Sequence, residues 1–401
     1  MPFHNRDDLN LYQNLESPSF FWRGASYQTI LTVAALSRLF IYALNKTEVH
    51  GLPRFLDLLK SRADYKTRRR GLVTVSNHIS VLDEPLIWGT LPVSFAAFHG
   101  YMNHRWSLGS HDICFKNAFT SHFFTLGQTL PIHRGAHSPF GGPYQATMTE
   151  AVRLLSKISA QKQSLAPLSN PRFHKDWKPP QWPWDCVDPF SDISPPPSYP
   201  SQPSDVRWYL APSRYASNSY SWVHIFPEGM IHQATDKTMR YFKWGVARLI
   251  LEPPECPDVV PMFIEGTDQV MHESRSWPRF IPRIGKKICL TIGRELDVEA
   301  VFGDLRKRWR DLADRHAREA GLPGGWDEMI LGLVPENLAN HPEAVQLRME
   351  CTQRVREAVL EVRRSRGLPD EDPKNGVVET WAREGPKREG LMDDGSWVKD
   401  T

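Results

Sequence analysis

The sequence is poor in cysteine, and its cysteines lie too far apart to suggest a metal centre. Five occur among the 401 residues: Cys114, Cys186, Cys256, Cys289 and Cys351. No two of them form a CxxC pair, and none has a histidine at the interval typical of zinc ligands. We therefore expect reduced, mainly structural thiols, with neither a metal nor another cofactor.

The sequence also lacks an excess of charge and a cleavable targeting signal. Its 49 basic and 46 acidic residues leave a formal net charge of +3, which is too balanced to indicate a nucleic-acid-binding surface. Residues 1–14 are polar and contain no apolar run with a small-residue cleavage site, so no signal peptide is expected. We therefore expect no nucleic-acid partner.

No apolar run is long enough to predict a membrane-spanning helix. Such a helix needs about 20 apolar residues, whereas the run from Tyr27 to Leu44 is shorter and contains Arg38. We expect an interfacial, membrane-associating helix with Arg38 at the head groups and its apolar side chains among the acyl chains: Leu31, Leu36, Leu39, Phe40 and Ile41. A buried amphipathic helix of a soluble domain is the alternative.

Short apolar segments alternate with helical ones along much of the chain. Segments typical of strands are 72–76, 130–133, 222–226, 259–264 and 287–292, and segments with helical spacing are 144–159, 239–251 and 305–318. This alternation predicts an α/β fold, with a mainly parallel or mixed sheet flanked by helices.

Two regions depart from this pattern. Residues 164–221 are rich in Pro, Ser and Trp and show no sustained period, so we expect an insertion that crosses the surface without joining the core. Residues 367–401 are charged and contain several glycines, which predicts a flexible tail.

A histidine and an aspartate follow the segment 72–76 at a spacing suited to general-base chemistry. The run from Asn77 to Pro85 holds His78 and Asp83 in a polar turn before a helix. A carboxylate bonded to one ring nitrogen fixes the tautomer, so the other nitrogen can take a proton from a hydroxyl. The alternative is that Asp83 only caps the helix.

Two further motifs also follow strand-like segments. Glu228 and Gly229 end the run FPEG, where the carboxylate could bind a hydroxyl and the glycine could admit substrate. Arg134 ends the run PIHR, and a guanidinium there suits a phosphate. A tight turn and a surface salt bridge are the respective alternatives.

Together, NHxxxxD, PIHR and FPEG resemble the motifs of the glycerophospholipid acyltransferase family. The runs HDICF from His111, WVHIFPEG from Trp222 and RYFKWG from Arg240 resemble the tafazzin branch of that family. This resemblance covers residues 22–296, apart from the insertion. It implies that residues 51–320 form an acyltransferase domain, preceded by residues 1–50 with the interfacial helix and followed by a C-terminal helical region and tail, 321–401.

The resemblance also implies roles for individual residues. His78 is the expected base and Asp83 its partner, and the expected substrate-binding residues are Asn77, Arg134, Glu228 and Gly229, with Asn77 supporting the turn. The second motif of the wider family usually has an acidic residue near its arginine, whereas Arg134 stands without one in the sequence.

The implied activity is transfer of an acyl chain from a phospholipid to a lysophospholipid without coenzyme A, remodelling cardiolipin from lysocardiolipin. No GxSxG nucleophile motif occurs, which fits direct transfer. The implied location is mitochondrial membranes facing the intermembrane space, with peripheral attachment. A coenzyme A-dependent acyltransferase and a non-catalytic lipid-binding protein remain alternatives, and a homo-oligomer remains open.

Overall fold

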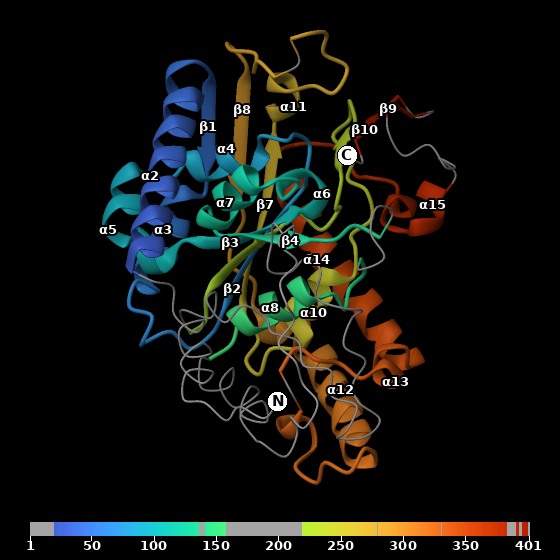
Figure 1. Ribbon diagram of the computed structural model, residues 1–401. Coiled ribbons are helices and arrows are strands. Elements are labelled where there is room, and N and C mark those ends of the chain that lie inside the picture. Colours follow the sequence, from blue (N-terminus) through green and yellow to red (C-terminus); the bar gives the residue numbers. More distant parts are fainter. Residues whose placement is uncertain are drawn as a thin grey trace.

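A seven-stranded mixed sheet forms the centre of the molecule in a computed structural model, which describes residues 20–135, 141–157, 219–278, 280–329, 331–382, 390–392 and 395–399 (Figure 1). The strand order is β1-β8-β7-β2-β5-β3-β4. Strands β7, β2, β5, β3 and β4 are parallel, whereas β8 and β1 run the other way. The bounds are β1 Lys46–His50, β2 Leu72–Ser76, β3 Arg105–Ser110, β4 Thr129–Ile132, β5 Trp222–Ile225, β7 Asp258–Glu265 and β8 Lys287–Ile292.

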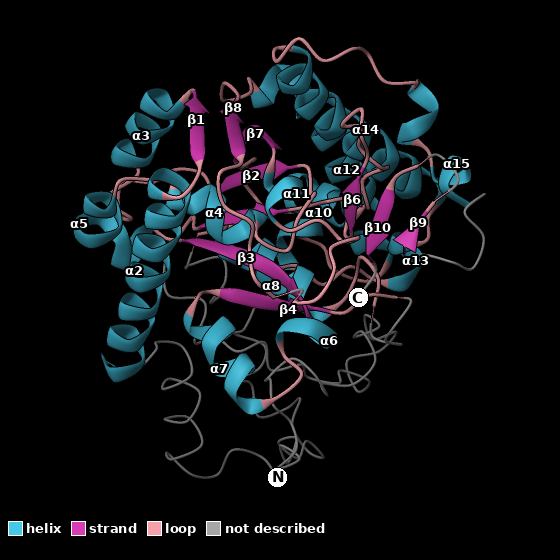
Figure 2. Cartoon of the chain, turned by 90° about the horizontal axis from the view of Figure 1, so that it is seen from above, coloured by secondary structure: helices cyan, strands magenta, loops and turns pink. Residues whose placement is uncertain are grey.

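Helices cover both faces of this sheet (Figure 2). On one face lie α2 (Phe20–Ala43), α3 (Leu52–Ser61), α4 (Asp83–Gly89) and α5 (Val93–Asn103), and on the other lie α8 (Ala146–Leu154), α10 (Gly245–Leu251), α12 (Val298–Glu319) and α14 (Pro342–Arg364). The sequence prediction of an α/β fold with a mixed sheet between helices is confirmed.

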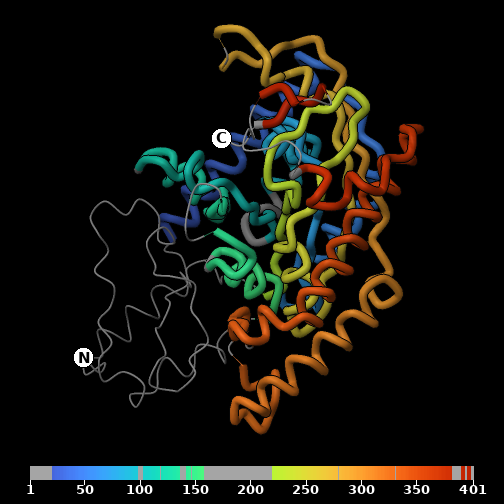
Figure 3. Tube along the Cα trace, turned by 90° about the vertical axis from the view of Figure 1, so that its right-hand side faces the viewer, coloured from blue at the N-terminus to red at the C-terminus, as the bar shows by residue number. Residues whose placement is uncertain are grey.

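Alternation along the strands divides the core into two layers. In β2, Val73 and Val75 belong to the apolar cluster that includes α8, α10, α12 and α14, whereas Leu72 belongs to the cluster with α3, α4 and α5. Successive strand residues point to opposite faces, so each strand contributes to both layers. In Figure 3, α12 and α14 (orange to red) pack side by side on the outer surface of their layer.

A smaller sheet includes the C-terminal segment. Strands β6 (Ile231–Gln233), β10 (Trp397–Lys399) and β9 (Gly390–Leu391) pair in this order, and Val398 is fully buried. The described part of the expected flexible tail therefore contributes to a sheet. The strands of this smaller sheet are too short, and have too many charged neighbours, for an alternation of apolar and polar residues to be visible in the sequence.

The N-terminal helix α2 packs against the domain along one face. It contacts α4, α5 and α7 (Ala118–Leu126), and Ile41 is fully buried. The Arg38 guanidinium does not extend toward head groups as expected. Its Nη1 donates to the carbonyl oxygens of Gly89, Thr90 and Leu91 at 3.4, 3.0 and 3.2 Å. Gly89 ends α4 and Thr90 is its C-cap, so these two carbonyls lack partners within the helix.

No helix in the described part of the chain is both long and apolar enough to cross a membrane. The remaining described helices are short: α6 (His111–Cys114), α11 (Thr267–Val270), α13 (Glu336–Ala339) and α15 (Val378–Ala382), with 3-10 turns at Gly325–Glu328 and Pro373–Gly376. The expected insertion at 164–221 lies outside the described residues except for 219–221. The division into three domains stays a prediction.

Candidate active site

The candidate residues gather where neighbouring parallel strands end. His78 lies two residues beyond β2, Glu228 three beyond β5, and Thr267 two beyond β7. These three strands are adjacent in the sheet. Loops at the carboxyl ends of parallel strands are the usual place for ligand sites in α/β folds.

His78 and Asp83 form a hydrogen-bonded pair. The distance from His78 Nδ1 to Asp83 Oδ2 is 2.9 Å. The same oxygen accepts backbone N–H groups from Ile79 at 2.6 Å and Ser80 at 2.8 Å, and Thr267 Oγ1 donates to Asp83 Oδ1 at 2.5 Å. Because Asp83 is fully buried, these donors fix a carboxylate that would otherwise be costly to bury.

Asp83 does not cap α4. Leu82 occupies the N-cap position and makes no side-chain cap bond, while Asp83 begins the helix itself. Its carboxylate reaches back over the preceding turn instead of forward to the helix N–H groups. The alternative in which Asp83 only ends a helix is therefore not what the structure shows.

The His78 ring is held on its face as well as at its edge. Phe226 stacks on it at a centroid distance of 4.4 Å with an interplanar angle of 26°, and 22% of the histidine side chain stays exposed. With Nδ1–H donated to Asp83, Nε2 is the nitrogen that can accept a proton. The pair therefore has the arrangement of a general base and its orienting partner.

Glu228 holds the backbone of His78. Its Oε1 accepts the His78 N–H at 2.8 Å and its Oε2 accepts the Arg240 N–H at 2.9 Å. Burial raises the pKa of Glu228 to about 7, against the opposing effect of these two N–H donors. Both oxygens are engaged by backbone, so the geometry favours positioning of the turn over contact with a substrate hydroxyl.

Asn77 and Gly229 also serve local geometry. The Asn77 amide donates to Ile264 O at 2.9 Å and accepts from Ile264 N at 2.8 Å, which fastens the end of β2 to β7. Gly229 has a φ of 67°, and a Cβ there would lie 2.7 Å from Lys243 Nζ. The Lys243 side chain therefore lies beside Gly229, and the expected role of Gly229 in substrate binding stays a prediction.

Arg134 lies beyond β4, and the strands β5 and β3 separate β4 from β2. Its Nε donates to Asp112 Oδ1 at 3.1 Å and its Nη2 donates to Asp112 Oδ2. Asp112 follows β3, so the acidic partner that the sequence motif lacked comes from the neighbouring strand end. The phosphate-binding role of Arg134 stays a prediction, since a phosphate would compete with this carboxylate.

A buried polar network beneath the pair was missed from the sequence. Glu84 Oε1 accepts Trp88 Nε1 at 2.9 Å and Arg105 Nε at 3.0 Å, and Glu84 Oε2 lies 3.9 Å from His224 Nε2. The His224 ring meets Phe226 edge to face. Burial lowers the pKa of His224 to about 4, so the imidazole is neutral at neutral pH.

Sequence signals for these residues were partial. Glu84 adjoins Asp83, and His224 stands within WVHIFPEG, so both could have been found by asking which polar residues flank the motifs. Thr267 carries no such signal, because its contact with Asp83 joins positions 184 residues apart.

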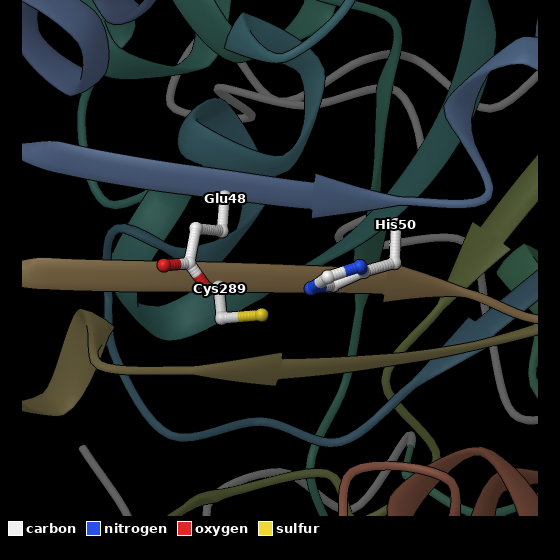
Figure 4. Close-up of side chains that lie close together, drawn as sticks. All are labelled: Glu48, His50 and Cys289. Carbon is white, nitrogen blue, oxygen red and sulfur yellow. The ribbon is translucent and has the colours of Figure 1, made fainter.

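Three possible metal ligands converge away from this site (Figure 4). Glu48 and His50 on β1 and Cys289 on β8 place one ligand atom each within 4.8 Å of one another. Two cations already engage them: Lys287 Nζ lies 3.0 Å from Glu48, and Arg366 Nη1 donates to His50 Nε2 at 3.1 Å. Burial also raises the pKa of the Cys289 thiol. We assign no role to this cluster, and the expectation of no metal stays a prediction.

Comparison of the sequence with those of known proteins identifies the family of this chain. The tafazzin of Saccharomyces cerevisiae is 32% identical over 371 residues, which cover 90% of this chain and 84% of the yeast protein. The chain belongs to the tafazzin family. A tafazzin of Drosophila melanogaster is 29% identical across 74% of this chain and 58% of the fly protein. No protein-family model matches the chain.

A plant enzyme is also related to this tafazzin-family chain. The N-acylphosphatidylethanolamine synthase of Arabidopsis thaliana is 28% identical across 67% of this chain and 70% of its own length. The chain is therefore an acyltransferase with a role in phospholipid chemistry. The resemblance to tafazzins seen in the sequence is confirmed.

Proposed function

We propose that this tafazzin-family protein transfers an acyl chain from a phospholipid to a lysophospholipid, with His78 as general base and Asp83 as its orienting partner. The observation that carries the proposal is the 2.9 Å bond from His78 Nδ1 to a fully buried carboxylate. It sets the tautomer whose Nε2 accepts a proton.

The reaction needs one proton to move twice. His78 Nε2 removes the proton from the free hydroxyl of the lysophospholipid as that oxygen attacks the ester carbonyl of the donor. The tetrahedral oxyanion then collapses, the bond to the donor glycerol oxygen breaks, and the imidazolium returns the proton to that oxygen. General-base catalysis contributes about 10²- to 10⁴-fold, so the placement of both lipids must supply much of the rest.

An ester is both consumed and formed in this exchange, so no activated donor is needed and coenzyme A is not required. The tafazzin relationship supports a phospholipid donor and cardiolipin remodelling from lysocardiolipin. The same catalytic pair could serve a coenzyme A-dependent acyltransferase, which is the competing proposal.

The other site residues have supporting roles in this proposal. Glu228 and Asn77 hold the turn that carries His78, Gly229 leaves room for Lys243 beside Glu228, and Arg134 is the proposed ligand of a lipid phosphate. The proposed location is a mitochondrial membrane facing the intermembrane space, with peripheral attachment that includes α2.

The test presents both kinds of donor to the purified protein. Lysocardiolipin in bilayers is supplied with acyl-labelled phosphatidylcholine and no coenzyme A, or with labelled acyl-coenzyme A. We expect label in cardiolipin from phosphatidylcholine alone, and a loss of at least about 10²-fold in His78→Ala, since the variant lacks the base.

His50→Ala is the matched control, because His50 is an exposed histidine on β1 outside the site. It should keep full activity. Transfer only from acyl-coenzyme A would replace the proposal with the competing one. Undiminished transfer by folded His78→Ala would show that His78 is not the base.

A further inference from the structure

One end of the sheet carries both the catalytic pair and a projecting loop. Strands β2 and β7 are parallel, so their carboxyl ends share an edge; β8 is antiparallel to β7 and begins at that edge. The described residues between α11 and β8, 271–278 and 280–286, therefore lie at the same end as His78. Figure 1 shows this loop (gold) extending past the ends of β7 and β8, and Figure 3 shows it projecting at the top of the molecule.

The loop exposes large apolar side chains instead of burying them. Trp277 is 84% exposed and Phe280 is 74% exposed, and Ile281 and Ile284 are exposed as well. Apolar groups of this size on one short segment usually mark a surface that another body covers.

The C-terminal half of α2 extends this surface. Leu36 and Leu39 are each 61% exposed, and Tyr42 and Leu44 are also exposed. The two segments are joined directly, because Gly285 N donates to Leu44 O at 2.7 Å. We call the joint set the docking surface; its residues are Leu36, Leu39, Tyr42, Leu44, Trp277, Phe280, Ile281 and Ile284.

Basic residues outnumber acidic ones along the loop, in which Glu273 is acidic, is buried and lies 3.7 Å from Arg275. From position 274 to position 287 the sequence contains five basic residues and no acidic one: Arg275, Arg279, Arg283, Lys286 and Lys287. Arg283 is exposed, and Lys287 is exposed but pairs with Glu48 at 3.0 Å. Aromatic and aliphatic side chains interleaved with basic ones match the chemistry of an anionic bilayer, where the rings enter the interface and the cations meet phosphates.

We propose that the docking surface binds an anionic phospholipid bilayer, with the loop from Trp277 to Ile284 as an insertion element beside α2. The base of this loop is tied to the catalytic turn. Gln233 Nε2 donates to Ile79 O at 2.7 Å and to Met271 O at 3.2 Å. Insertion of the loop therefore fixes the height of the catalytic turn above the bilayer.

This inference deepens the proposed membrane attachment but does not depend on the acyl donor or on catalysis. The test measures binding of the full chain to phosphatidylcholine vesicles with and without phosphatidylglycerol, by co-sedimentation. We expect Trp277→Ser with Phe280→Ser to weaken binding to anionic vesicles at least about tenfold. Arg283→Glu should weaken binding to anionic vesicles several-fold and leave binding to neutral vesicles unchanged.

Val377→Ser with Val378→Ser is the control, because this apolar pair is about half exposed in a different segment and should leave binding unchanged. His78→Ala should also bind as the unaltered protein does, which separates this inference from the catalytic proposal. Wild-type binding by the Trp277 and Phe280 double variant would overturn the inference. So would an unchanged vesicle affinity accompanied by a changed oligomeric state, which would assign the surface to a protein partner.

Discussion

At the scale of single residues, Glu228 makes the stability of the protein depend on pH. Burial raises the pKa of Glu228 from 4.5 to about 7, so the native state binds this proton more tightly than the unfolded chain does. The stability that Glu228 contributes is complete below its pKa in the unfolded chain, 4.5. It is lost as the pH rises through its pKa in the folded protein, about 7. The loss is on the order of 3 kcal/mol.

Glu228→Gln removes this titration and one of the two acceptors for backbone N–H. We expect the variant to be less stable than the wild type at about pH 5. The difference should shrink toward about pH 8, because ionisation of the buried Glu228 carboxyl destabilises only the wild type. Urea unfolding at both pH values measures this. Exposed Glu319→Gln is the control, and a difference that does not change with pH would contradict the assignment.

The hydrogen-bonded pair of His78 and Asp83 was predictable at this scale because its members are five positions apart on one turn. Its supports were not. The Thr267 hydroxyl donates to Asp83, which is 184 positions earlier in the sequence. The Arg240 N–H donates to Glu228, which is 12 positions earlier. A single sequence contains no pattern that joins such positions, and only the packing of β7 beside β2 brings Thr267 to the site.

At the scale of elements, hydrogen bonds from a charged side chain connect α2 to the end of α4. Arg38 donates to three carbonyl oxygens at and just beyond the end of α4. Arg38→Met would leave these acceptors without the guanidinium, and we expect a loss of about 1–3 kcal/mol in unfolding free energy. Guanidinium chloride unfolding followed by circular dichroism measures this loss.

Gln28→Met, on the exposed side of the same helix, is the control and should change stability by less than about 0.5 kcal/mol. Vesicle binding of Arg38→Met should equal that of the wild type. Weaker vesicle binding with unchanged stability would restore the head-group role that the sequence indicated for Arg38.

Five of the seven strands of the main sheet were predicted, including the edge strand β4, whereas the edge strand β1 and the interior strand β3 were missed. The five predicted strands are all present, and 72–76 and 287–292 match β2 and β8 in both bounds. The edge strand β1 was missed because Lys46, Glu48 and His50 point to solvent and leave only a weak apolar signal. The predicted helix at 239–251 begins later, at Gly245, because residues 239–243 instead form the loop that carries the Arg240 N–H to Glu228.

At the scale of the whole molecule, the C-terminal region supports the turn that carries His78, the proposed base. Arg356 on α14 donates to Met239 O at 2.8 Å and to Arg240 O at 3.1 Å, and its guanidinium pairs with Glu371 at 2.5 Å. Arg363 lies 3.3 Å from the same carboxylate. These contacts hold the loop whose Arg240 N–H binds Glu228.

Glu371→Gln would leave two buried guanidinium groups without their anion. Removing one partner of a buried ion pair costs about 3–5 kcal/mol, and we expect a loss of this size together with reduced acyl transfer. Thermal unfolding and the transfer assay measure both. The adjacent Asp370→Asn removes an exposed partner of Arg364 and should cost less than about 1 kcal/mol; an equal loss in both variants would contradict the role of Glu371.

The pairing of β1 with β8 has a consequence for biosynthesis. Lys46 leaves the ribosome long before its sheet neighbour Lys287, and chains emerge from their amino terminus. After His78, the proposed base, and the apolar side of α2 have been synthesised, they therefore wait for β8 before the sheet that supports them can be completed. A transcript truncated after the FPEG motif would still encode His78, Asp83 and Glu228, yet its product would lack Thr267, β8 and Glu371. Intact motifs in such a shortened chain are therefore no sign of an active protein.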